Sequence, residues 1–324
     1  MTPDAAPDTP RTSPAWEAWT IRALAALAVL VPVILAATAW GGVVHGHPAY
    51  GVTLAVTAVL GALTLWRWRR ARRAGGALLL FARVGGILAT VAWIAVLAWM
   101  RPATAVEPAL AAMESDGTVT VTESATAITM TPAGGGDSTG VLFQPGALVD
   151  ARAYAAVLRP LAEAGHSVVI TKQPFGIAFF NLGALDAARA THSEVSQWVV
   201  GGHSLGGVVA SMSAEADASA DAFTPVTGLL LFASYPAGDI SGSLTAAVES
   251  ISGSEDGLST PAAIDASRAD LPADAHFTVV EGAVHAYFGD YGTQRGDGTS
   301  TISHDDARAQ ISAAAVEFVD SLGD

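Results

Sequence analysis

The stretch WVVGGHSLGG, residues 198–207, decides the fold of this chain. Its first part is a short apolar run with β-branched residues and predicts a buried strand over Trp198–Gly201. The residues from Leu205 to about Ala216 predict a helix. Between the two elements the chain reads Gly-x-Ser-x-Gly, with Ser204 at its centre. A strand that passes directly into a helix needs a sharp turn whose neighbours lack bulk, and this context predicts that Ser204 is an exposed nucleophile.

Short strands and helices alternate on both sides of this turn. Such alternation predicts parallel βαβ units, and therefore a three-layer α/β fold with a mostly parallel central sheet. We expect an opening hairpin (118–121 and 127–131), further strands (141–144, 167–171, 228–232, 247–251 and 277–280) and helices (151–164, 182–195, 261–267 and 305–322).

A serine nucleophile needs a base, and in this strand–turn–helix arrangement the chain order is Ser, acid, His. Three histidines follow Ser204. His276 would begin the strand 277–280, where a side chain is usually structural, and His304 precedes the last helix. His285 lies in the loop after the strand, at the carboxyl edge where the site must be. We therefore favour His285 as the base.

The acid should follow the strand before the histidine loop. Asp256 lies in the stretch GSEDG, residues 253–257, directly after the predicted strand 247–251. A carboxylate there would hold the imidazole tautomer and stabilise the imidazolium. Its neighbour Glu255 is an alternative, and Asp239, which follows the strand 228–232, is the runner-up.

An acyl-transfer site also needs two N–H donors for the oxyanion. One is the backbone of Leu205, the residue after the nucleophile, and the other comes from the loop after the strand 141–144. Because Pro145 has no N–H, Gly146 is the first candidate and Ala147 the second.

Five stretches of the chain form a recognisable set: FQPGALVD (143–150), KQPFGIA (172–178), GGHSLGG (201–207), GSEDG (253–257) and GAVHAYFGDYG (282–292). Together they resemble the bacterial α/β-hydrolase fold-5 domain family. The resemblance covers about half of the chain and implies the α/β-hydrolase three-layer sandwich, with Ser204, Asp256 and His285 as the catalytic triad. Gln144 departs from the family, which often has an aromatic residue there.

These residues predict a carboxylesterase-like serine hydrolase that cleaves an ester or related acyl bond of a small-molecule substrate through an acyl-enzyme. Two alternatives remain open: an acyltransferase that uses the same triad, and a non-catalytic binding protein with this fold. Only about a dozen residues, Ser234–Thr245, separate the strand 228–232 from the next element. They are too few for a helical cap domain, so we expect an open site that prefers small acyl esters.

No metal or cofactor is expected. The sequence has neither a His-Glu-x-x-His motif nor a phosphate-binding Gly-rich loop with a Lys. His45 and His47 form a His-x-His, but two imidazoles without a third ligand make a weak metal site. The acidic, Gly-rich residues 289–298, which include Asp290 and Asp297, lack the alternating oxygen ligands of a calcium loop. We interpret them as a hydrogen-bonded turn.

Three long apolar runs precede the α/β part. Residues 23–44, 48–66 and 77–100 are each long enough to cross a hydrocarbon core of about 30 Å, and only the third contains a charge within it, Arg83. Three such runs in a row predict transmembrane helices rather than buried core helices or a cleaved signal peptide. The membrane bilayer is therefore an expected partner of the chain.

Basic residues predict the orientation of these spans. Arg67, Arg69, Arg70, Arg72 and Arg73 lie between the second and third runs, and the loop between the first two has no Lys or Arg. Because basic loops remain in the cytoplasm, we expect a multi-pass protein of the cell membrane with a cytoplasmic N-terminus and an extracytoplasmic catalytic domain.

The composition agrees with this division. The 324 residues include no Cys, which excludes thiol catalysis, and the formal net charge is −14. Residues 101–324 carry seven Arg and one Lys against 27 acidic residues, so binding of nucleic acid is not expected. We expect a disordered tail (1–19), a membrane anchor (20–100), a linker (101–117) and a catalytic domain (118–324).

Overall fold

A computed structural model describes residues 15–67, 77–136, 138–219 and 223–323. The chain forms two compact units. One unit combines the residues up to Trp40 with Gly51–Arg101, and the other combines Gly41–Tyr50 with Pro102–Asp324.

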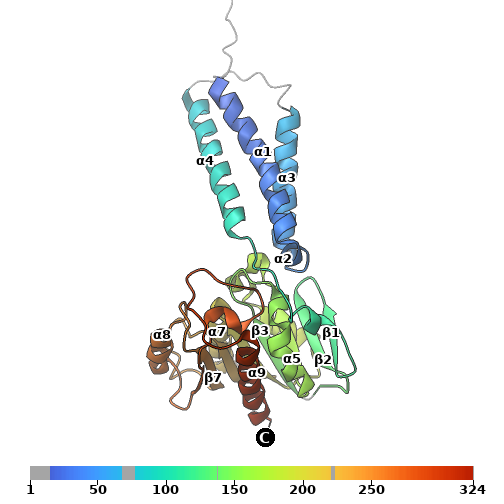
Figure 1. Cartoon of the computed structure of the whole chain (residues 1–324), viewed down its shortest axis with the longest axis vertical. Coiled ribbons are helices and arrows are strands. Elements are labelled where there is room, and N and C mark those ends of the chain that lie inside the picture. Colours follow the sequence, from blue (N-terminus) through green and yellow to red (C-terminus); the bar gives the residue numbers. More distant parts are fainter. Residues whose placement is uncertain (1–14, 68–76, 137, 220–222, 324) are drawn as a thin grey trace, which may run out of the picture. The chain divides into compact units, whose positions relative to one another are not determined.

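The first unit is helical (Figure 1). Its long helices are α1 (Ala15–Thr38), α3 (Pro48–Arg67) and α4 (Ala77–Trp99), and all three are long and apolar enough to cross a membrane. A short helix, α2 (Trp40–Val44), follows α1 in the sequence, and all of it except Trp40 belongs to the second unit. Polar contacts join the long helices: the Arg83 guanidinium donates to the Glu17 carboxylate at 3.3 Å, and the indole N–H of Trp93 donates to Thr57 at 3.0 Å.

The first apolar helix begins earlier than expected. Because α1 starts at Ala15, residues 15–19 of the predicted disordered tail are helical. Glu17 in the first turn suits the positive end of the helix dipole and also pairs with Arg83, which explains why the helix extends back past the apolar run. The rest of the predicted tail, residues 1–14, and most of the Arg-rich loop lie outside the described residues.

The second unit is built on an eight-stranded sheet with the order β1-β2-β4-β3-β5-β6-β7-β8. The hairpin of β1 and β2 pairs antiparallel, and β2 pairs antiparallel with β4, whereas the other neighbours are parallel. The expected mostly parallel sheet is therefore confirmed. The strands are β1 (Val119–Glu123), β2 (Ala127–Pro132), β3 (Thr139–Gln144), β4 (Ser167–Thr171), β5 (Gln197–His203), β6 (Val226–Phe232), β7 (Ala247–Gly253) and β8 (His276–Val280).

Helices cover both faces of this sheet (Figure 1). On one face α5 (Ala155–Glu163) and α9 (His304–Ser321) pack against Phe143 and its neighbours, and on the other α6 (Ala184–Thr191) and α7 (Leu205–Ala218) pack with Leu142. Both faces of the central strands are apolar because both are buried. The remaining helical segments are α8 (Pro261–Ala266) and the 3₁₀ turns η2 (Ala111–Met113), η3 (Ala151–Tyr154), η4 (Pro174–Gly176), η5 (Ala178–Asn181), η6 (Ser267–Asp270) and η7 (His285–Phe288).

One predicted helix is much shorter than expected. The helix expected over 182–195 is observed only as α6, because His192 already has a non-helical backbone with φ −124° and ψ 68°.

The segment predicted as a linker belongs to the second unit. Ala103 exchanges backbone hydrogen bonds with the chain after β3, donating to Leu148 at 2.7 Å and accepting from Asp150 at 2.9 Å. Ala105 and Ala109 are buried in the core. The boundary expected at residue 118 is therefore wrong, since small apolar residues in irregular backbone contribute to a core without any periodic pattern that would mark them.

Candidate active site

Ser204 occupies a strained turn at the carboxyl end of β5. Its backbone has φ 51° and ψ −122°, a conformation that residues with a Cβ rarely adopt. The turn is fixed by the Ser204 N–H, which donates to Phe232 O at 3.0 Å, and by the Ser234 hydroxyl, which donates to Ser204 O at 2.7 Å. Such strain costs about 1–3 kcal/mol and persists only where surrounding structure imposes it.

Gly202 and Gly206, two positions before and after Ser204, must be glycine because other backbone segments approach them closely. A Cβ on Gly202 would meet the backbone of Gly206, and a Cβ on Gly206 would meet the carbonyl groups of Gln144 and Pro145. The turn therefore has no room for side chains on either side of Ser204. The helix α7 starts directly behind it, which turns the free N–H groups of a helix N-terminus toward the same place.

The structure brings His285 and Asp256 together. The Nδ1 of His285 lies 2.8 Å from Oδ2 of Asp256, and both side chains are buried. The other oxygen of Asp256 accepts the backbone N–H of Leu258 at 2.7 Å and of Ser259 at 2.8 Å. These bonds fix the carboxylate, which in turn fixes the orientation of the imidazole ring.

The imidazole lies beside the nucleophile turn. The ring of His285 is 4.5 Å from the ring of His203, the residue before Ser204. Asp256 follows β7 and His285 follows β8, while Ser204 follows β5. Because these strands are parallel, all three loops meet at the same edge of the sheet.

The competing residues have other partners. Asp239 is exposed and accepts the N–H and the hydroxyl of Ser241. His276 pairs with Glu249 at 2.6 Å across β7 and β8. His304 stacks on the ring of Tyr287.

The structure corrects the expected oxyanion donor. The N–H of Gly146 donates to the hydroxyl of Tyr154 at 2.9 Å, so it is already paired and cannot also serve an oxyanion. Among the described residues, no protein acceptor takes up the N–H of Ala147 or of Leu205. The N–H groups of Ala147, the second candidate, and of Leu205 are therefore the ones available to an oxyanion, and that of Gly146 is not.

Tyr154 was not indicated by the sequence and supports this loop together with His203. Its hydroxyl lies 2.8 Å from Nδ1 of His203. Burial raises the pKa of Tyr154, so the phenol keeps its proton and can donate it to Nδ1. Burial, together with the neighbouring His285, holds the pKa of His203 well below its usual value, so the imidazole stays neutral. Tyr154 lies in a helical segment with an ordinary buried pattern, which carried no signal of this role.

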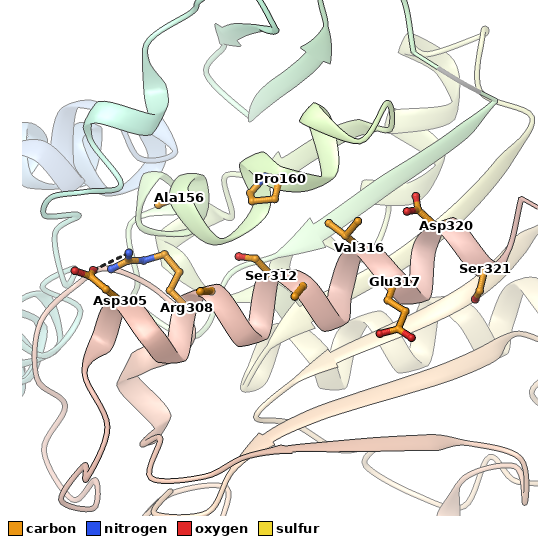
Figure 2. A pocket seen from close by; sticks show the side chains of 11 residues that line it. Ala156, Pro160, Asp305, Arg308, Ser312, Val316, Glu317, Asp320 and Ser321 are labelled. Atoms are coloured by element: carbon orange, nitrogen blue, oxygen red, sulfur yellow. Dashed lines mark hydrogen bonds and ion pairs between the residues drawn. The ribbon is translucent and has the colours of Figure 1, made fainter.

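A separate groove of about 910 Å³ runs between α5 and α9 (Figure 2). Its lining combines small or apolar side chains such as Pro160 and Val316 with charged ones: the Arg308–Asp305 ion pair at one end, and Glu317 and Asp320 toward the other. The lining includes no loop that carries Ser204, Asp256 or His285, so the groove is not part of this site.

Within the described part of the chain, no three His, Asp or Glu side chains gather as metal ligands. His45 contacts the carboxylate of Glu123 at 3.1 Å, and the Nδ1 of His47 accepts the N–H of Ala49 at 3.1 Å. The two rings of the His-x-His thus face different partners.

Comparison with known proteins identifies the class. Residues 140–309, more than half of the 324-residue chain, match the model of the alpha/beta hydrolase family. The chain belongs to this family. It is also similar to a solved structure, a thermophilic esterase from the Planctomycetes species Thermogutta terrifontis, with 16% sequence identity and a TM-score of 0.45 over 64% of this chain and 93% of that one. No curated protein matches the chain.

Proposed function

We propose that this protein is a membrane-anchored, carboxylesterase-like serine hydrolase with Ser204, His285 and Asp256 as its triad. The observation that carries the proposal is the buried His285–Asp256 pair at 2.8 Å, at the edge of the sheet where Ser204 occupies its strained turn. Membership of the alpha/beta hydrolase family supports the same reading.

Each residue has a defined role in the proposed reaction. Asp256 holds the Nδ1 of His285, which leaves Nε2 as the nitrogen that can accept the proton of the Ser204 hydroxyl. The hydroxyl oxygen attacks the acyl carbon, and the N–H groups of Leu205 and Ala147 stabilise the oxyanion. The imidazolium then protonates the leaving alcohol, and water activated by the same imidazole hydrolyses the acyl-enzyme.

The helices α1, α3 and α4 are the proposed anchor. Their length and apolar composition support insertion into a bilayer, and the five Arg residues from Arg67 to Arg73 favour an extracytoplasmic position for the catalytic unit. Protease added to intact cells should then cut the chain beyond Arg101. Complete protection of that part would contradict the orientation.

Fluorophosphonate labelling of the full chain in detergent tests the chemistry. We expect a covalent adduct that mass spectrometry locates on Ser204 and that Ser204→Ala does not form. A folded wild-type protein that forms no adduct would contradict the proposal and favour a non-catalytic binding protein.

Turnover of an activated ester, with and without an added alcohol, separates hydrolysis from acyl transfer. We expect release of the free acid in both conditions. Predominant formation of the new ester would instead identify an acyltransferase with the same nucleophile.

A further inference from the structure

Asp297 connects the two loops that carry the proposed acid and base. Its Oδ1 accepts the backbone N–H of Gly257 at 3.2 Å, next to Asp256, and the backbone N–H of His285 at 3.1 Å. Its Oδ2 accepts the N–H of Ala286 at 2.8 Å. A single carboxylate thus receives N–H groups from the acid loop and from the histidine loop.

The segment around Asp297 fits closely against the acid loop. Asp297 Oδ1 also accepts the N–H of Gly298 at 2.8 Å. A Cβ on Gly298 would collide with the carbonyl oxygen of Glu255, so the close approach requires glycine there. The acidic, Gly-rich residues 289–298 therefore include a segment that is hydrogen-bonded to both the acid loop and the histidine loop.

A carboxylate is well suited to this position. Ionised carboxylates accept several backbone N–H bonds at once, and such charge-assisted bonds are stronger than neutral ones. The direct bond between His285 and Asp256 is made by side chains, whereas Asp297 fixes the backbones from which both side chains project. The side-chain bond and the backbone bonds to Asp297 therefore both constrain the position of the His285 imidazole relative to the Asp256 carboxylate.

We propose that Asp297 is a positioning residue that sets the distance and orientation of the Asp256–His285 pair. This role rests on the proposed hydrolase function. Asp297 contacts no reacting atom. It acts through the loop backbones, so its loss should slow the chemical step and leave substrate binding almost unchanged.

The substitution Asp297→Asn tests this role with little change in volume. The amide oxygen can replace Oδ1, but the amide NH₂ would then face the N–H of Ala286, so that two donors oppose each other. We expect kcat for an activated ester to fall on the order of 10²-fold, because displacement of a catalytic group by about 1 Å has effects of that size. KM should change less than about threefold, because the contacts to substrate remain.

A matched control is Asp116→Asn. Asp116 also accepts two backbone N–H groups, those of Thr118 and Val119, but lies in the turn before β1. We expect this variant to keep wild-type kcat. A loss of kcat in Asp297→Asn no larger than in the control would overturn the proposal.

A double-mutant cycle separates positioning from general destabilisation. In the Asp256→Asn background the acid–base pair is already broken, so adding Asp297→Asn should slow fluorophosphonate labelling by less than about threefold. A full additional loss in that background would show that Asp297 acts independently of the pair and would overturn the proposal. If Asp297→Asn does not fold, Asp297→Glu, which moves the carboxylate by one methylene group, carries the same expectations.

The wild-type chain distinguishes this inference from the proposed function itself. If wild-type protein does not label at Ser204, the hydrolase proposal fails and the positioning role fails with it. If wild-type protein labels normally and Asp297→Asn labels equally fast, only the positioning role fails.

Discussion

The two units of the chain distribute apolar and charged side chains in opposite ways. In the helical unit, Leu30 is 53% exposed and Phe81 77% exposed, while the carboxylate-bearing Glu17 is only 1% exposed. In the α/β unit, Phe143 and Trp198 are fully buried. The same amino-acid types thus face outward in one unit and inward in the other.

This contrast teaches that the two units suit different surroundings. Apolar side chains on the outside of a helix bundle are favourable in hydrocarbon, where polar groups turn inward and pair, as Glu17 does with Arg83. Burial of the apolar side chains of the α/β unit is favourable in water. The contrast predicts that chemistry and anchoring can be impaired separately.

The strongest test of this separation is Ser204→Ala. We expect ester hydrolysis to fall on the order of 10⁶-fold, because the nucleophile is lost. Membrane association should be unchanged, since the substitution lies in the α/β unit. Ester turnover and the membrane-bound fraction are measured on the same preparation. Unchanged turnover by pure Ser204→Ala protein would refute the assignment of the nucleophile.

Asp256→Asn should have the next largest effect. We expect a loss on the order of 10⁴-fold in kcat, because the amide holds the wrong imidazole tautomer. Asp239→Asn is the control, and since Asp239 bonds only to Ser241 among the described residues, it should change kcat less than about twofold. If Asp239→Asn is the damaging change, the acid follows β6 instead of β7.

A charged substitution on the exposed apolar face of the helical unit tests whether this unit inserts into a bilayer. Leu30→Arg places a cation in the middle of α1, which costs about 3 kcal/mol of insertion free energy and lowers the equilibrium constant for insertion on the order of 10²-fold. Val279 in β8 is 48% exposed, so Val279→Arg is a control of similar exposure in the other unit. Carbonate extraction of membranes measures both. Equal extraction of the two variants would contradict the inference that the helical unit is suited to hydrocarbon and the α/β unit to water.

The acyl-chain preference has the smallest expected effect. With no helix between β6 and β7 in the described residues, kcat/KM for p-nitrophenyl esters should change only a few-fold from acetate to octanoate and should not rise further. A deep apolar tunnel would add about 0.8 kcal/mol, or about fourfold, for each buried methylene. Phe180, 62% exposed in η5, is the side chain to test if the rate does rise. A steady rise to palmitate would show that the α/β unit also binds lipid chains.

Local patterns were sufficient for most of the fold. The strand and helix around Ser204 were predicted because residues close in sequence determine a tight strand–turn–helix connection. The expectation that site residues lie in loops after the carboxyl ends of parallel strands selected His285 and Asp256. The structure brings these two side chains within hydrogen-bond distance. Parallel strands align their ends, so the chain order of strands and loops already contains this information.

The remaining features depend on contacts between distant residues. The N–H of Gly146 is occupied by Tyr154, and the segment around Ala105 is bound to the α/β unit by side chains and backbone far along the chain. Asp297 receives N–H groups from residues 11 to 40 positions away. Neither periodicity nor a motif encodes such pairings, because they arise only when the sheet has assembled.

The backbone of Ser204 has a consequence for how such a sequence can change over generations. Glycine adopts φ 51° with ψ −122° without the steric penalty of a Cβ, so Ser204→Gly removes strain of about 1–3 kcal/mol. If Ser204 is the nucleophile as proposed, a single codon change that ends catalysis also relieves this strain in the fold. Selection for stability alone would then favour an inert relative with the same architecture, and only selection for the proposed reaction would keep the serine in place.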